Sequence, residues 1–198
     1  MTVPPDTKTT KPPEADPNPE AMEKLRGGIA HLCASFGTCD YDSVNAILTI
    51  KRTAMEFENF SAVYFRQYGL SPGRFNVLMA LFGLPDHTQS LSDLGDYLVV
   101  TRANITGLVD GLVEDGFLRR LDHPDDRRVV LAQLTPKAIE FLNWFAPLHH
   151  QNIKTLLAPF STKEKREVVA FCDKLRAQLR STTPLLETLG GERKESIS

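Results

Sequence analysis

One stretch, from Ser90 to Thr135, constrains the fold more than any other, because its hydrophobic period changes from helical to extended along the way. Ser90, followed three residues later by Asp93, fits the capping box that opens a short helix. Thr101 fits the N-cap of a second helix, which ends before Gly116. Residues 99–101 form the turn between them. The apolar faces that we predict are Leu91, Leu94, Tyr97 and Leu98 in the first helix and Ile105, Leu108, Val109 and Leu112 in the second.

Two short apolar runs follow this pair of helices, at 117–121 and 129–134, and their composition is typical of strands. The residues from Asp122 to Asp126 favour a turn, and Arg127 and Arg128 open the return strand. Two helices joined by a turn and followed by a two-stranded hairpin predict a winged helix-turn-helix. In such a module the second helix enters the major groove of duplex DNA, and the hairpin arginines reach a backbone or a minor groove.

The hairpin resembles the wing of MarR-family regulators, whose pattern is D-x-R followed some residues later by L-T. Here the pattern is Asp126, Arg128, Leu134 and Thr135, and the preceding LVDGLVEDGFL resembles the family's recognition helix and first wing strand. The likeness covers roughly residues 43–179. It implies a DNA-binding transcriptional regulator, in the first instance a repressor, that is not an enzyme and needs no cofactor or metal. It also implies a homodimer in which the first, fifth and sixth helices interleave, and a palindromic operator with recognition helices about 34 Å apart.

The resemblance also assigns site residues. Family members usually carry basic or polar side chains where this sequence has Gly107 and Gly111, so major-groove reading is left to the first part of the helix. Asp126 is expected to brace Arg128 or the partner subunit, because phosphates repel a carboxylate. Arg119 and Arg120 alternate along a strand, so at most one faces DNA. The predicted DNA-binding residues are Thr101, Arg102, Asn104, Thr106, Arg127 and Arg128, with Asp126 as wing support.

The charge balance leaves a second class of function open. The chain has 23 basic and 25 acidic residues, a net charge of −2, which is not the footprint of a protein that coats DNA without specificity. Between 101 and 137 basic and acidic residues are equal in number, so DNA affinity depends on where the charges point. A winged-helix protein-interaction module without DNA binding therefore stays an alternative.

The fold class that we predict is mainly α with a small β wing, an α+β winged helix-turn-helix flanked by long dimerisation helices. Residues 1–18 are rich in Pro, Thr and charge and predict a disordered tail, and 19–42 form an N-terminal extension that permits an extra helix. Residues 43–182 form the MarR-like domain. Within it, 70–135 are the DNA-binding lobe, and 43–68 and 136–182 are dimerisation helices, the first capped by Ser43. Residues 183–198 are a C-terminal tail.

A small effector is the expected signal, because members of the resembling family commonly bind aromatic carboxylates or phenols between the dimerisation helices and the DNA-binding module. Arg74 would anchor the anionic group. The aromatic residues would serve equally well as ordinary core. By position, the pocket residues that we predict are Phe57, Tyr64, Arg74, Phe75, Met79, Trp144 and His149.

Three further chemistries are weighed against this interpretation. Cys33 and Cys39 are candidates for a redox switch, since peroxide-sensing relatives use an N-terminal cysteine, but Cys33 also falls beside an apolar stripe where packing is sufficient. Residues 69–73 match the G-x-S-x-G of hydrolases, yet a predicted helix precedes the serine where that motif needs a strand. Adjacent His149 and His150 point apart on a helix and lack the spacing of metal ligands.

Location follows from composition. No apolar run approaches the roughly 18 residues of a membrane-spanning helix, and from the polar, Pro-rich N-terminus we expect no signal peptide. Three cysteines without metal spacing suit a reducing compartment. We expect a cytoplasmic, nucleoid-associated protein whose partners are double-stranded DNA, a second copy and a small effector, with no membrane.

Overall fold

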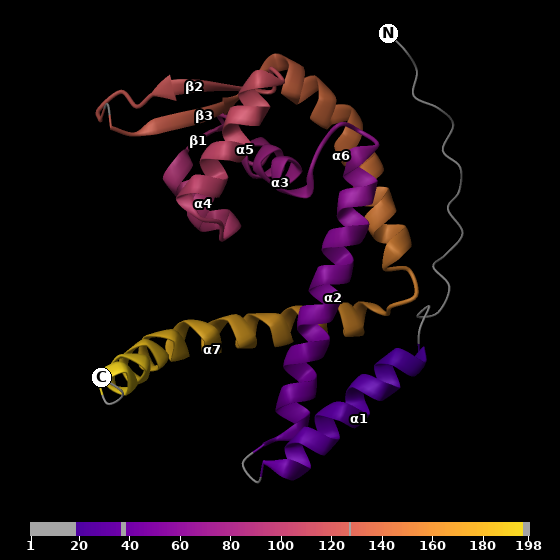
Figure 1. Ribbon diagram of the computed structural model, residues 1–198. Coiled ribbons are helices and arrows are strands. Elements are labelled where there is room, and N and C mark those ends of the chain that lie inside the picture. The colour runs from indigo at the N-terminus through magenta and orange to yellow at the C-terminus, as the bar shows by residue number, and fades with distance from the viewer. Residues whose placement is uncertain (1–18, 37–38, 127, 196–198) are drawn as a thin grey trace. The chain divides into compact units, whose positions relative to one another are not determined.

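The computed structural model describes residues 19–36, 39–126 and 128–195, and the tail predicted at 1–18 lies outside them. The chain divides into two compact units, Met1–Pro147 and Leu148–Ser198, which are described separately. The helices and strands appear in chain order in Figure 1. They are α1 (Pro19–Ser35), α2 (Tyr41–Arg66), α3 (Pro72–Phe82), β1 (Thr88–Ser90), α4 (Leu91–Leu98), α5 (Arg102–Glu114), β2 (Leu118–Asp122), β3 (Val130–Leu134), α6 (Pro136–Leu156) and α7 (Thr162–Glu195).

The helix starts in the winged-helix region lie where the caps predict them. Ser71 Oγ accepts a hydrogen bond from the Arg74 N–H at 3.3 Å, with Pro72 at the first helical position. Ser90 Oγ accepts one from the Asp93 N–H at 3.1 Å, which opens α4. Gly116 has a positive φ of 73° just past the end of α5, as its position predicts.

Two helix boundaries differ from the prediction. Asp40, not Ser43, caps α2: its side chain accepts from the Asp42 N–H at 3.1 Å and from the Ser43 hydroxyl, so the helix begins at Tyr41. A carboxylate accepts both bonds at once and also suits the positive end of the helix dipole, which favours the earlier start. At the other end of the chain, α7 continues to Glu195, past the boundary predicted near 182.

The wing contains a strand that the sequence analysis did not predict. The sheet has the order β1-β3-β2, and both pairings are antiparallel. Ser90 pairs with Leu131, and Leu118 pairs with Leu134. The Gln133 amide donates to the Thr88 hydroxyl at 2.7 Å, which ties the short β1 to the hairpin. The β2–β3 hairpin therefore projects from a three-stranded base (Figure 1).

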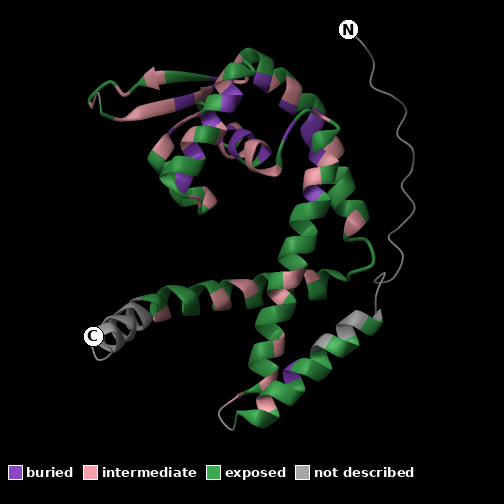
Figure 2. Cartoon of the chain, in the orientation of Figure 1, coloured by how far each residue is buried: buried purple, intermediate pink, exposed green. Residues whose placement is uncertain are grey.

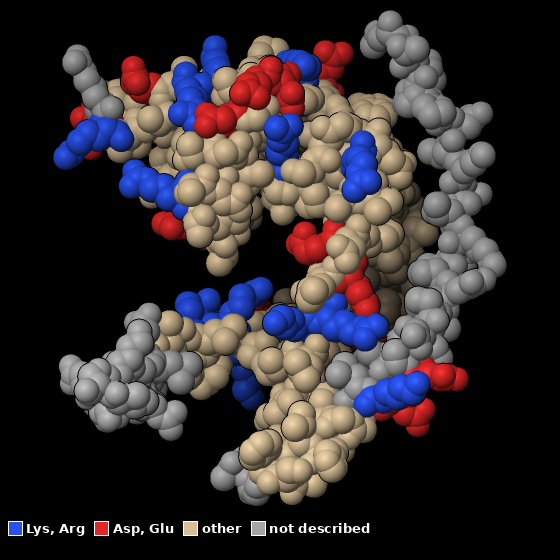
Figure 3. All heavy atoms as spheres, in the orientation of Figure 1, with Lys and Arg blue, Asp and Glu red and all other residues tan. Residues whose placement is uncertain are grey.

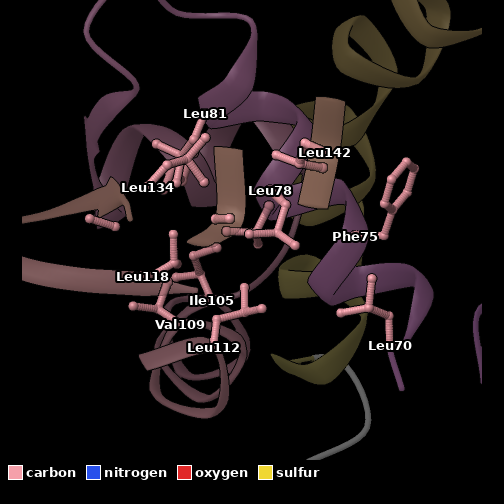
Figure 4. Packing of buried hydrophobic residues seen from close by; sticks show 14 of the residues in the cluster. Leu70, Phe75, Leu78, Leu81, Ile105, Val109, Leu112, Leu118, Leu134 and Leu142 are labelled. Carbon is pink, nitrogen blue, oxygen red and sulfur yellow. The ribbon is translucent and has the colours of Figure 1, made fainter. Parts of the chain in front are cut away.

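One hydrophobic core holds the winged helix together. Figure 4 shows Ile105, Val109 and Leu112 of α5 beside Leu118 of β2, near Leu78 of α3. Ile105, Val109, Leu112 and Leu78 are all fully buried. Burial of each such side chain contributes about 1.5–3 kcal/mol. The orientation of α5 is thus fixed by the strands and by α3, and the buried residues of Figure 2 concentrate in this region.

Aromatic rings join α2, α3 and α6 within the first unit. Phe65 of α2 stacks on Phe75 of α3 with 4.5 Å between ring centroids, and Phe145 of α6 lies 5.4 Å from Phe75. Tyr68 meets Phe145 edge-on at 4.6 Å. The C-terminal end of α2 is therefore part of the core, whereas Figure 2 shows its N-terminal half mostly exposed.

The N-terminal extension contains a helix, α1, despite the adjacent Gly27 and Gly28. Among the side chains of α1 that the structure describes, Ile29 is the buried one, and α1 packs against α2. In the second unit, α7 begins with the predicted capping box, in which Ser161 Oγ accepts from the Glu164 N–H at 3.2 Å and Glu164 Oε2 accepts from the Ser161 N–H at 2.7 Å. None of the described helices combines the length and apolar character of a membrane span.

Candidate nucleic-acid interface

The second helix of the helix-turn-helix, α5, presents its N-terminal end to solvent. Thr101 Oγ1 accepts a hydrogen bond from the Asn104 N–H at 3.3 Å, which fixes the start of the helix. Ile105 and Val109 face the core, so Arg102 and Asn104 face outward and are exposed. The arrangement leaves one cationic and one amide side chain free to reach base edges or phosphates.

Thr106 lies on the same side but is half-buried. Its hydroxyl donates to the Arg102 carbonyl at 2.8 Å, so its proton is already used within the helix. An oxygen lone pair and the methyl group remain for contact with another molecule. Of the three predicted groove readers, Arg102 and Asn104 are therefore better placed than Thr106.

At the wing, Asp126 holds Arg128 in place. The Asp126 carboxylate accepts hydrogen bonds from Arg128 Nε at 3.1 Å, from Nη2 at 3.2 Å and from the backbone N–H at 3.0 Å. The hydrogen bond from the Arg128 side chain lowers the pKa of Asp126 below its ordinary value of 3.8. Arg128 is nevertheless 91% exposed, so the guanidinium is oriented without being buried. Arg127 lies outside the described residues.

The two arginines of β2 point to different partners. Arg119 Nε donates to the Gln133 side chain at 2.7 Å on the neighbouring strand. Arg120 Nη2 pairs with Asp110 of α5 at 2.6 Å, so it ties the wing to the recognition helix. Figure 3 shows basic side chains at the tip of the hairpin and acidic ones interleaved with them farther back. Ion pairs such as Arg120–Asp110 neutralise part of the positive charge of the wing. The positive charge available to a ligand therefore depends on which basic side chains are exposed, and not on how many the wing contains.

The glycines of α5 differ in their surroundings. A Cβ on Gly107 would meet nothing within 4 Å, so this position is open. A Cβ on Gly111 would lie 1.9 Å from Arg74 Nη2, because the guanidinium of Arg74 crosses the helix there. The absence of a side chain at Gly111 therefore leaves the space that the Arg74 guanidinium occupies, and any larger residue at 111 would displace it.

Arg74 takes part in a junction that sequence reasoning missed. Its Nη1 pairs with Asp115 Oδ2 at 2.7 Å, at the C-terminal end of α5. Lys137 of α6 donates to the Asp115 carbonyl at 2.6 Å and lies 4.7 Å from the Phe117 ring centroid. Asp115 thus connects the end of the recognition helix to α3 and to α6. The sequence separation of Arg74 and Asp115, 41 residues, leaves no local pattern that could signal the pair.

The predicted effector residues are only partly brought together. Phe75 is buried in the hydrophobic core, and Tyr64 and Met79 pack against that core. The ring centroids of Tyr64 and Phe145 are 6.0 Å apart. Arg74 is turned toward Asp115. Trp144 is 47% exposed at the edge of this cluster, 6.1 Å from Tyr68.

The other two predicted effector residues are Phe57 and His149. Phe57 is exposed, and its ring centroid lies 6.5 Å from that of Phe60. His149 belongs to the second unit, and burial, with a smaller contribution from His150, lowers its pKa. Among the described residues, no group of three His, Cys, Asp or Glu side chains could hold a metal ion.

Both N-terminal cysteines lie near the junction of α1 and α2. Cys33 of α1 and Cys39, just before α2, form a disulfide. Cys172 of α7 is a free thiol. The disulfide links the end of the extension helix to the start of the long helix, and it lies outside the winged helix.

The architecture is that of a winged-helix transcriptional regulator, and comparison with known proteins agrees. The model of the MarR family matches residues 70–130. The HTH-type transcriptional repressor YetL of Bacillus subtilis (strain 168) is 34% identical over 137 residues, 69% of this chain and 82% of YetL. The transcriptional regulator MhqR of the same organism is 31% identical, over 62% of this chain and 83% of MhqR.

Solved structures agree on the fold. The MarR family regulator Sco3205 of Streptomyces coelicolor, in complex with DNA, superposes with a TM-score of 0.64 and 22% identity, over 71% of this chain and 89% of that one. At this identity the likeness supports the fold alone. On the matches in sequence, the chain belongs to the MarR family and is a regulator, not an enzyme.

Proposed function

We propose that this protein is a transcriptional repressor that binds a palindromic DNA operator as a homodimer in the cytoplasm. The observation that carries the proposal is the pairing of an exposed, capped helix end, at Thr101 and Arg102, with an arginine held at the wing tip by Asp126. The similar protein YetL is named a repressor, and Sco3205 is described in complex with DNA, which supports the same function here.

Arg102 and Asn104 read base edges in the major groove, with Thr101 and Thr106 beside them. Arg128, and Arg127 next to it, contact the backbone or minor groove at the wing. Because Arg120 is neutralised by Asp110, the charge that reaches DNA comes from few side chains. Specificity then depends on their placement.

A homodimer is supported by apolar side chains that a monomer would expose. Along α2, four such residues are each at least 55% exposed: Met55, Phe57, Phe60 and Val63. On α7 of the second unit, Val168, Val169 and Phe171 are more than half exposed as well. Exposed apolar patches of this kind mark interaction sites. We assign both helices to the dimer interface.

We further propose that a small aromatic or anionic effector releases the DNA. The half-exposed Trp144 offers aromatic surface at the edge of the cluster that joins α2, α3 and α6. An effector bound there favours dimers with wrongly spaced recognition helices. Oxidation is a second candidate signal, and the observation in its favour is the Cys33–Cys39 disulfide. DNA binding measured before and after reduction distinguishes the two.

The first test is binding of the purified protein to the DNA upstream of its own gene, titrated across salt concentrations. We expect a nanomolar, sequence-selective complex whose affinity falls steeply with salt. Weak binding that is equal for any sequence would contradict the proposal and favour the protein-interaction module.

A further inference from the structure

Val99, in the turn of the helix-turn-helix, has a backbone conformation that suits glycine. Its φ is 55° and its ψ is 45°, in the left-handed region. The Val99 N–H donates to the Asp96 carbonyl at 3.3 Å, and the Val100 N–H donates to the Gly95 carbonyl at 3.0 Å. These are the two hydrogen bonds of a Schellman motif, whose left-handed residue is usually glycine. A β-branched residue there is a genuine outlier.

The side chain of Val99 does not compensate for this backbone conformation by packing in the core. It is 90% exposed, whereas its neighbour Val100 packs against the core. Tyr97, which the sequence places on the apolar face of α4, is 76% exposed instead. Two large apolar side chains thus project from the end of α4 and the turn after it, and the backbone of Val99 opposes the local conformational preference of its residue type. Such violations concentrate where a residue serves function and not folding.

We propose that Val99 is a specificity-determining DNA contact, with its isopropyl group against an apolar group of the operator and Tyr97 beside it. This inference rests on the proposed function. The turn leads directly into Thr101 and Arg102, and the first residues of a recognition helix are those that contact base edges. Val99 is 90% exposed and precedes Arg102 by three residues, so its side chain is within reach of DNA bound at the start of α5. Apolar partners exist there in two forms, the C5-methyl of thymine and the deoxyribose of the backbone.

The experiment uses a duplex selected from a random-sequence library by the wild-type protein. Val99→Gly relaxes the backbone, so thermal stability should be unchanged or higher. It also removes the isopropyl group, so the Kd for DNA should rise about tenfold, because the complex no longer buries a valine side chain. Val99→Asn is the matched variant, because asparagine tolerates the left-handed region and keeps a similar size without the apolar surface. It should lose a comparable share of affinity.

A second duplex, with deoxyuridine in place of thymidine, distinguishes the two apolar partners. If it weakens the wild type but not Val99→Gly, the contact is a thymine methyl. If Val99→Gly weakens binding equally on both duplexes, the contact is deoxyribose, which carries no base identity, and the role in specificity is overturned.

Wild-type affinity in both variants would overturn the inference, and so would a loss in Val99→Gly alone, which would indicate turn rigidity. If the wild type selects no sequence, the proposed function fails instead.

Discussion

Arg128 is the wing residue whose role is most directly measurable, since its side chain is 91% exposed and held by Asp126. Arg128→Ala should weaken binding across DNA sequences and flatten the plot of log affinity against log salt by about one unit, the effect of losing one phosphate contact. The matched control is Arg119→Ala, which removes the same charge from a side chain bonded to Gln133. Equal losses in the two variants would mean that net charge and not wing position governs affinity.

Arg102→Ala should act differently, because Arg102 is exposed at the start of the recognition helix. We expect relaxed base preference at one operator position, measured by comparing affinities for operators with single substitutions. A uniform weakening on every operator would place Arg102 on phosphate alone.

At the residue scale, sequence reasoning succeeds where the signal is local. Ser71, Ser90, Thr101 and Ser161 cap their helices as predicted, because a cap needs only its neighbours three residues on. It does not find pairs whose partners are distant along the chain, such as the ion pair of Arg74 and Asp115, while the role of Arg74 in effector binding stays a prediction.

At the scale of the element, the two glycines of α5 give a matched pair of variants. Gly107→Ala should stabilise the protein by about 1 kcal/mol, because alanine is the better helix former and the site is open. Gly111→Ala gains the same propensity but displaces the Arg74 guanidinium from Asp115, so its net gain should be smaller. Chemical denaturation measures both. In an Arg74→Ala background Gly111→Ala should recover its full gain, and persistence of the deficit there would contradict the steric account.

The capping box of α7 predicts a pH dependence. The hydrogen bond from the Ser161 side chain lowers the pKa of Glu164 below its ordinary 4.5. A depressed folded pKa means that the stabilisation is present above pH 4.5 and is lost as the pH falls through the folded value. Ser161→Ala should therefore return the Glu164 pKa, followed by NMR titration, toward 4.5. No movement of that pKa would show that the box does not hold the carboxylate in solution.

Elements with strong periodicity were predictable, and short ones were not. The recognition helix and the hairpin follow from apolar spacing and turn residues. The strand β1 is the three residues Thr-Gln-Ser, which carry no alternation of their own, and it exists because β3 offers a partner. The N-cap of α2 is Asp40 and not Ser43, because the sequence offers two capping residues within four positions and the local pattern does not choose between them.

At the scale of the whole molecule, the proposed dimer requires the apolar residues of α2 to be covered. Phe60→Glu places a charge on a surface where Phe57 and Phe60 contact each other and each is 55% exposed. Burying that charge in an interface is costly, whereas a free monomer tolerates it. We expect the variant to sediment as a monomer and to lose operator affinity, because a single half-site offers half the contacts. Asn59→Glu, an equal charge at an exposed polar neighbour, is the control and should remain dimeric. A Phe60→Glu protein that stays dimeric and binds the operator normally would remove α2 from the interface and leave α7 as the element to test next.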